Sequence, residues 1–232
     1  MAALMACSAP NAAPAAKPDH ALPQLGVMGT IPLYWGETAE FGDVLTGQGR
    51  PHWARAVLER GYRLVPLDAL DAAALRPVTD LLMAQPRALT AGENVALDQW
   101  VRAGGRVLLL ADPRMTGESR YSIGDKRRPH DVTLLTPILA HWGLAMTFDE
   151  DQPDGYRTEQ AGGGPVPVNL PGQLSVMAGS SQCRVSGGGV LALCVLGRGR
   201  ATVVADAAVL DSQAPREPAV TALVRLAAQA FP

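Results

Sequence analysis

The stretch LTAGENVALDQWVRAGGRVLLLADP, residues 89–113, decides the fold class of this chain. Thr90 and Glu93 have the spacing of a capping box, in which each side chain bonds a free backbone N–H at a helix start. An apolar stripe follows at helical spacing, made of Ala96, Leu97, Trp100 and Val101. Gly104 ends the helix, and the continuous apolar run RVLLLA then reads as a buried strand. Units of this kind fold as right-handed crossovers in a parallel sheet whose two faces are covered.

The same alternation extends through the rest of the chain. Apolar runs predict strands at 25–34, 62–68 and 79–86, and two more within 190–210 on either side of a Gly-Arg-Gly turn. Helical spacing predicts helices at 52–61, 133–143 and 218–231, with Thr133 as the cap of the second and a short helix or turn at 69–78. Residues 151–189 are rich in Gly and Pro and predict an antiparallel β insertion or sheet edge.

Length and charge limit the possible functions. A chain of 232 residues suits one large α/β domain, which we place at 25–232. Lys and Arg total 20 against 22 Asp and Glu, so the chain lacks the basic excess that binding to nucleic acid phosphates requires. The longest apolar runs are shorter than the roughly 20 residues that span a bilayer. We therefore expect a packed globular body that does not bind nucleic acid.

The N-terminal segment 1–24 is predicted to be a disordered tether. ALMAC, ending at Cys7, has the Leu-x-Ala-Cys order of a bacterial lipobox, and an Ala/Pro tract follows it. Only six residues precede Cys7, which is fewer than a secretory signal needs. Two interpretations stay open: a lipoprotein acylated at Cys7, in the periplasm or anchored to a membrane, or a cytoplasmic protein with a disordered tail.

The other two cysteines flank a run of glycines in CRVSGGGVLALC. A two-residue turn at Gly188 and Gly189 would place Cys183 directly opposite Cys194, where a disulfide can form. Such a disulfide indicates an oxidising compartment. The alternative is a pair of buried thiols in a reduced protein.

Two parts of the chain resemble a known family. The segment LLMAQPRALTAGENVALDQWVRAGGRVLLLADP, together with GRGRATVVADAAVL and the closing helix, resembles the glutamine-amidotransferase-like domain of gliding-motility type auxiliary proteins of ABC transporters. Intraflagellar-transport 52-like domains are related to it. The resemblance covers roughly residues 25–112 and 190–230. It implies a three-layer, flavodoxin-like, mostly parallel sheet and a binding or scaffolding role in a membrane-associated system.

Open α/β sheets bind ligands beyond the carboxyl ends of their strands, so we expect one rim to carry the functional side chains. Nine residues follow the predicted strands: Pro32, Tyr34, Trp35, Glu37, Gln85, Arg87, Asp112, Arg114 and Asp206. The proline in QPR and in DPR stiffens the turn, so the two arginines can clamp an anionic group or instead pair with neighbouring carboxylates. Tyr34 and Trp35 can stack on a saccharide or an aromatic ligand, or can plug the end of the sheet. The ligand is thus a small anionic molecule, a saccharide or a protein partner.

Catalytic motifs are missing from the sequence. Class I amidotransferases use a cysteine at a strand-to-helix elbow and an activating histidine, and no cysteine of this chain has that placement. The four histidines are scattered without metal-ligand spacing, and neither a metal nor a cofactor is predicted. We expect a non-enzymatic binding or scaffold protein of the bacterial cell envelope. The alternative is a hydrolase that uses the carboxylates Asp112, Asp206 and Glu37.

Overall fold

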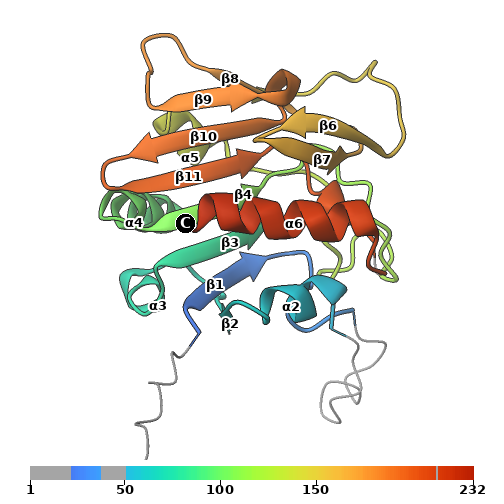
Figure 1. Ribbon diagram of the computed structural model, residues 1–232, viewed down its shortest axis with the longest axis horizontal. Coiled ribbons are helices and arrows are strands. Elements are labelled where there is room, and N and C mark those ends of the chain that lie inside the picture. The colour runs from blue at the N-terminus through green and yellow to red at the C-terminus, as the bar shows by residue number, and fades with distance from the viewer. Residues whose placement is uncertain (1–21, 38–50, 213) are drawn as a thin grey trace, which may run out of the picture.

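A seven-stranded sheet runs through the middle of the molecule (Figure 1). The computed structural model describes residues 22–37, 51–212 and 214–232. In spatial order the strands are β2 (Arg63–Pro66), β1 (Gln24–Gly29), β3 (Asp80–Ala84), β4 (Arg106–Leu110), β11 (Gly199–Val204), β10 (Leu191–Leu196) and β9 (Cys183–Ser186). The first five are parallel, and β10 is antiparallel to both of its neighbours. The predicted α/β class with a mostly parallel sheet is confirmed.

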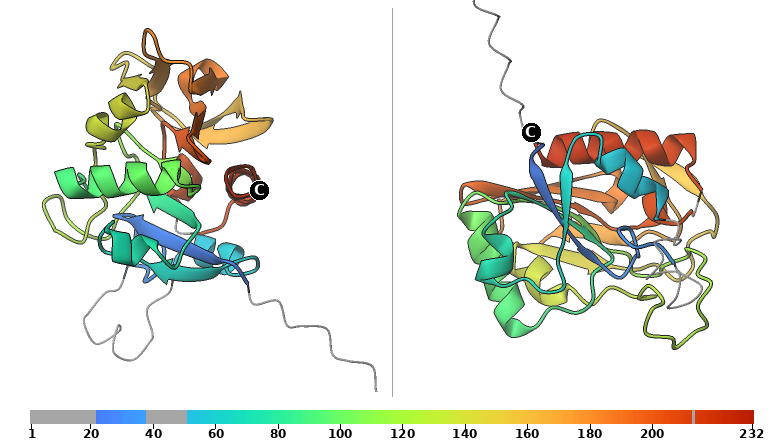
Figure 2. Two further views of the ribbon diagram at one scale, coloured as in Figure 1. Left: turned by 90° about the vertical axis from the view of Figure 1, so that its left-hand side faces the viewer. Right: turned by 90° about the horizontal axis from the view of Figure 1, so that it is seen from below.

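Helices cover both faces of this sheet, as the predicted three-layer arrangement requires. They are α2 (Trp53–Leu58), α3 (Ala72–Leu75), α4 (Ala91–Arg102), α5 (Thr136–His141) and α6 (Glu217–Ala230). The left view of Figure 2 shows α4 and α6 on opposite sides of the strands. One buried apolar cluster joins the sheet to α2 and α6, and a second joins the other face to α3, α4 and α5.

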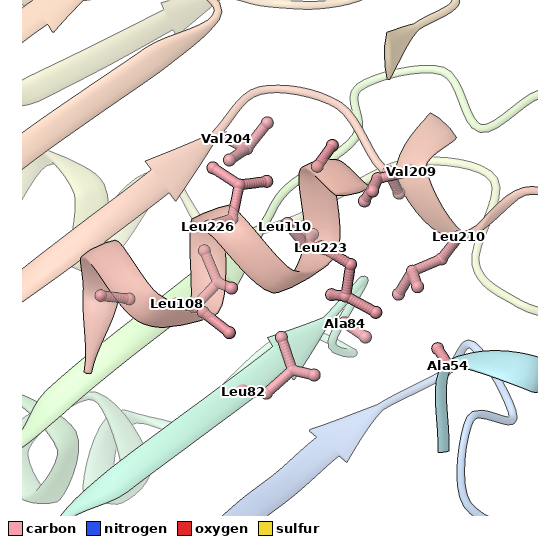
Figure 3. Close-up of a cluster of buried hydrophobic side chains, with 14 of the residues drawn as sticks. Ala54, Leu82, Ala84, Leu108, Leu110, Val204, Val209, Leu210, Leu223 and Leu226 are labelled. Atoms are coloured by element: carbon pink, nitrogen blue, oxygen red, sulfur yellow. The ribbon is translucent and has the colours of Figure 1, made fainter. Parts of the chain in front are cut away.

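The first cluster supplies much of the packing energy. Leu223 and Leu226 of α6 lie over the central strands, where Leu82, Leu108 and Leu110 project toward them (Figure 3). All five side chains are fully buried, and burial of such a side chain contributes about 1.5–3 kcal/mol. The continuous apolar runs of β3 and β4 arise because alternate residues face the two different clusters.

The antiparallel insertion predicted near 151–189 is present as two small sheets and an edge strand. β5 (Leu144–Thr147) pairs with β8 (Gln173–Val176), and β6 (Arg157–Ala161) pairs with β7 (Gly164–Val168). Arg225 of α6 donates hydrogen bonds to carbonyl oxygens of the second pair and so fixes it against the helix. The strand β9 then joins the edge of the main sheet.

Two predicted boundaries are wrong. The first strand ends at Gly29 rather than at Tyr34, because the Ala84 carbonyl oxygen fills the space beside Gly29 and Thr30 turns its N–H onto Gln85. Pro32 therefore lies in the turn that follows the strand. The helix α5 begins at Thr136, with Leu135 at its N-cap, so Thr133 is not the cap.

The edge hairpin keeps the predicted register with a longer loop. Cys194 pairs directly with Cys183, and the two sulfur atoms form a disulfide. The last paired residues are Ser186 and Leu191, so four residues instead of two make the turn. Glycines at 187–189 permit it because all three have positive φ.

Within the described ranges 22–37, 51–212 and 214–232, the helices all fall short of the length and apolar character that crossing a membrane requires.

Two glycine substitutions test this packing in opposite directions. A Cβ added at Gly199 would lie 2.0 Å from the Val101 carbonyl oxygen and 2.2 Å from that of Gly105. We expect Gly199→Ala to lower the free energy of unfolding by more than about 2 kcal/mol, because β11 must move off α4. Gly92→Ala, in the open first turn of α4, should instead raise it by about 0.5–1 kcal/mol. Urea unfolding of both variants measures this, and equal effects would contradict the packing described here.

Candidate functional site

The turn that follows β3 is built around Gln85. Its φ is 47°, in the left-handed region that a residue with a side chain enters only at a cost. The side-chain amide is fully buried and fully bonded. Nε2 donates to the carbonyl oxygens of Asp112 (3.0 Å) and His130 (2.9 Å), and Oε1 accepts the Asp112 N–H (2.8 Å). Gln85 therefore joins the carboxyl ends of β3 and β4 to the segment around residue 130.

Further hydrogen bonds around Gln85 close the crevice between β1 and β3. The strand order places the topological switch point here, which is where a flavodoxin-like sheet is expected to bind its ligand. Thr30 donates its N–H and its hydroxyl to the Gln85 carbonyl oxygen, at 3.0 and 2.6 Å. The hydroxyl also accepts the His130 N–H at 3.0 Å. Because protein groups fill this crevice, a ligand at the rim must bind farther along it.

Farther along the rim, Asp112 and Asp206 follow the neighbouring strands β4 and β11. Both side chains are buried almost completely. Each of their four carboxylate oxygens accepts a backbone N–H, from Arg114 and Ala207 at Asp112 and from Asn169 and Ala208 at Asp206. The two carboxylates thus fix the loops that leave the sheet.

Burial makes these carboxylates weak acids. Burial raises the pKa of Asp112 to about 7, against the opposing effect of its two backbone hydrogen bonds. The pKa of Asp206 is raised well above its usual value, by burial first and then by the charge of Asp112. Asp211 lies close enough to add to both effects, and burial raises its own pKa as well. The rim therefore holds three carboxyl groups whose ionised forms disfavour one another.

A pocket of about 370 Å³ opens beside this group of acids. Its lining comprises Thr116, Gly117, Glu118, Tyr156, Asn169, Asp211, Ser212, Ala214 and Arg216. Arg216 lies over the ring of Tyr156, 5.4 Å from its centre, and Thr116 donates its hydroxyl to Asp211. These residues are not among the predicted site residues, because they lie in loops without periodicity. The available signal for this pocket in the sequence was Asp211, a second acidic residue five positions after Asp206.

Arg87 lies away from these acids. Its guanidinium donates two hydrogen bonds to Glu93, at 2.7 and 2.9 Å, and one each to the carbonyl oxygens of Asp68 and Ala88. Glu93 is the acid of the predicted capping box, which the structure confirms, and its pKa falls to about 2, chiefly because of Arg87. Of the two interpretations of Arg87, the structure favours the ion pair that ties a loop to a helix.

Tyr34 and Trp35 pack together but differ in exposure. Their rings meet edge to face with centres 4.8 Å apart, and the Arg55 guanidinium lies 4.1 Å from the centre of the Tyr34 ring. Tyr34 also contacts the core cluster, as a plug would. Trp35 is 64% exposed, so its ring is available to a partner.

The remaining predicted residues are spread around these groups. Glu37 accepts the Arg120 N–H through Oε2, and its Oε1 is buried without a hydrogen-bond partner among the described residues. Arg114 is exposed, and its guanidinium has no partner in the described part of the chain. Pro32 is half-buried in the turn before Tyr34. Cys7 lies outside the described residues. The same ranges contain no group of three or more His, Cys, Asp or Glu side chains arranged to hold a metal ion.

The raised pKa values predict how stability depends on pH. The folded protein holds protons on Asp112 and Asp206 at pH values where the unfolded chain has released them. These groups therefore stabilise the fold most below about pH 4. The contribution of Asp112 is lost as pH rises through about 7, and that of Asp206 is lost at pH values above the usual range of a carboxyl group. We expect Asp206→Asn to flatten the loss of stability over a scan from about pH 4 to pH 8, because each proton that only the folded protein holds contributes a slope of up to ~1.4 kcal/mol per pH unit.

The quantity to compare is the slope of the free energy of unfolding against pH. The absolute free energy is less useful, because an Asn amide also disturbs the two N–H contacts of Asp206. His52, whose pKa is lowered by burial, titrates in both proteins and cancels in the difference. Denaturant unfolding across this pH range gives the result, and parallel pH profiles for the two proteins would contradict it.

A second prediction separates the two arginines. Arg87→Ala should lower the free energy of unfolding by about 1–2 kcal/mol, since it removes the partner of a nearly buried Glu93. The expected loss of unfolding free energy is no larger because the Arg87 side chain is 37% exposed, and solvent weakens an ion pair of this kind. Arg114→Ala should change stability by less than about 0.5 kcal/mol. If both variants unfold at the same denaturant concentration as the wild type, Arg87 does not tie the loop to α4.

Solved structures with the same fold include three with almost complete coverage of this chain. The N-terminal domain of mmIFT52 aligns with a TM-score of 0.51 and 16% identity, over 89% of this chain and 96% of its own. A putative ThuA-like protein from Bacteroides uniformis aligns at 0.53 and 10% identity, over 95% and 94%. A cold-adapted β-galactosidase from Rahnella sp. R3 aligns at 0.51 and 12% identity, and the aligned region is 90% of this chain but 31% of that enzyme. At these identities the likeness shows the fold alone.

Among curated proteins, none matches the sequence. A family profile described as "ABC-type uncharacterized transport system" matches residues 44–167, which is more than half of the chain. The resemblance identified from the sequence is thereby confirmed, and the chain belongs to this family of ABC-type transport system auxiliary proteins.

Proposed function

We propose that this protein is a non-enzymatic binding or scaffold subunit, auxiliary to an ABC-type transport system at the bacterial cell envelope. Membership of the family supports the connection with transport. The envelope location rests on the lipobox pattern at Cys7 and on the Cys183–Cys194 disulfide, which is typical of oxidising compartments.

The side chain of Gln85 is the observation that carries the non-enzymatic part of the proposal. Gln85 occupies a strained turn between a strand and a helix, the kind of position from which a nucleophile is presented in enzymes with an elbow. A carboxamide is not a nucleophile, and three hydrogen bonds already hold this one. The cysteines in the described part of the chain are joined to each other at the far edge of the sheet.

The partner surface in this proposal is the exposed end of the rim, with Trp35 as its anchor. A large ring that is 64% exposed and held against Tyr34 offers contact area with little side-chain entropy to lose. Arg114 lies on the same rim with its charge uncompensated among the described residues, which suits an anionic group on the partner.

A carboxylate-dependent hydrolase is the second candidate. It is favoured by the grouping of Asp112, Asp206 and Asp211, because neighbouring acids whose pKa values are raised by burial are typical of catalytic sites. The backbone hydrogen bonds to Asp112 and Asp206 weigh against it, since those oxygens are already used in holding loops.

Co-purification with the transporter subunits of the native host tests the proposal. We expect Trp35→Ala to weaken the complex by about 1–3 kcal/mol, roughly 5- to 150-fold in affinity, without lowering the melting temperature. Val95→Ala, an exposed apolar residue on α4, is the matched control and should bind like the wild type. Turnover of ester, amide, glycoside or phosphate substrates by the wild type that Asp112→Asn abolishes would overturn the proposal in favour of the hydrolase.

A further inference from the structure

A second pocket, of about 640 Å³, lies on the face of the sheet formed by β9, β10 and β11. Its volume is within the usual range for small-molecule sites. Its lining comprises Ser181, Gln182, Arg184, Leu193, Cys194, Val195, Arg200, Ala201, Thr202 and Gln229. In Figure 1, α6 and the β6–β7 pair lie in front of this face and leave uncovered the ends of β9 and β10 that are far from β6.

The strand register places two arginines on this face. Arg184, Leu193 and Thr202 lie side by side across β9, β10 and β11. Arg200 is two residues before Thr202, so its side chain projects from the same face of β11. Arg200 also pairs with Arg106, the first residue of β4, so the pocket lies toward the amino ends of the parallel strands and away from the carboxyl rim.

The pocket carries uncompensated positive charge. The ten lining residues include two arginines and no aspartate or glutamate. Neither guanidinium has an ion pair or hydrogen bond among residues 22–37, 51–212 and 214–232, and both arginines are exposed. By contrast, Arg102 and Arg106 nearby are neutralised by Asp98 and Asp80. A planar guanidinium without a partner suits a carboxylate or phosphate group, which it binds through two parallel hydrogen bonds.

Two uncharged groups in the pocket lack partners as well. Thr202 is only 1% exposed, and its hydroxyl has no hydrogen bond within the described residues. The side-chain oxygen of Gln229 also lacks a donor in the described part of the chain, but it is buried against Gly162 at the turn between β6 and β7, where a ligand in the pocket does not reach it. A nearly buried hydroxyl without a partner is costly, so a ligand with a hydroxyl or amino group would relieve that cost at Thr202.

From this arrangement we infer that the pocket binds a small organic acid with two anionic groups and a hydrogen-bond donor between them. The strand spacing and residue rise put the Cα atoms of Arg184 and Arg200 roughly 12 Å apart, on the diagonal of three strands. Each guanidinium takes one anionic end of the ligand. The hydroxyl of Thr202, which lies in line with Arg184 and two residues from Arg200, accepts a hydrogen bond from the hydroxyl or amino group. The inference is independent of the proposed role of the rim, since the two sites share no residue.

Three probes of graded chemistry test the inference by calorimetry at low salt: malate, succinate and butyrate. Malate carries two carboxylates and a hydroxyl, succinate lacks the hydroxyl, and butyrate keeps a single carboxylate. We expect saturable binding in the order malate, succinate, butyrate. Arg184→Ala and Arg200→Ala should each weaken malate binding about tenfold or more, the usual effect of losing a charge-assisted pair.

Two further variants make the test specific. Thr202→Val, which removes the hydroxyl and keeps the side-chain shape, should reduce the preference for malate over succinate while succinate binding stays the same. Arg60→Ala removes another exposed arginine without a partner among the described residues, so it is the matched control and should leave all affinities unchanged.

The inference fails if malate and succinate do not bind saturably at millimolar concentrations. It also fails if Arg60→Ala weakens binding as much as Arg184→Ala, since that result means general attraction of anions. The arginine variants should still co-purify with the transporter subunits, which keeps a failure here distinct from a failure of the proposed function.

Discussion

The pairing of the Gln85 side chain with the backbone of Asp112 is the contact on which the carboxyl rim depends. A carboxamide has the same donor and acceptor as a peptide group, so Gln85 extends the hydrogen bonding between β3 and β4 beyond the last backbone pair. The orientation of Asp112 follows from this, and its carboxylate then holds the turn after β11 through Ala207. Three loops that are distant in sequence thus share one buried network, and the strained φ of Gln85 is the cost of forming it.

This network occupies the part of the rim where a sheet of this architecture is expected to bind its ligand. An active site on an α/β sheet keeps polar groups unsatisfied and open to a substrate, particularly at the switch point. Here Thr30, Gln85 and His130 satisfy one another across that point, and the two buried aspartates accept backbone N–H groups. Among the described residues, the groups of the rim that remain exposed include the ring of Trp35 and the guanidinium of Arg114, which suit the recognition role proposed above.

The sequence predicted those parts of the molecule that depend on local pattern. The capping box at Thr90 and Glu93, the strand after Gly105 and the opposition of Cys183 and Cys194 all follow from spacing, and all are present. The failures arise where a distant residue decides. Nothing near Gly29 signals that the strand ends there, where the Ala84 carbonyl oxygen occupies the space that a Cβ atom would need. For Arg87 the sequence left two interpretations open, because the spacing of Arg87 and Glu93 does not show whether the turn brings the guanidinium back onto the helix cap.

The position of β11 in the middle of the sheet has a consequence for how the chain folds. β4 and β11 are neighbours in space, although all of residues 111–198 separate them in sequence. During synthesis the β4 edge and its apolar faces are made long before β11 and α6, which cover them. Until then an open strand edge is available to other chains, and closure of such a long loop is slow. The segment matched by the family profile ends at residue 167, before β11 and α6, so that segment alone would keep this edge exposed.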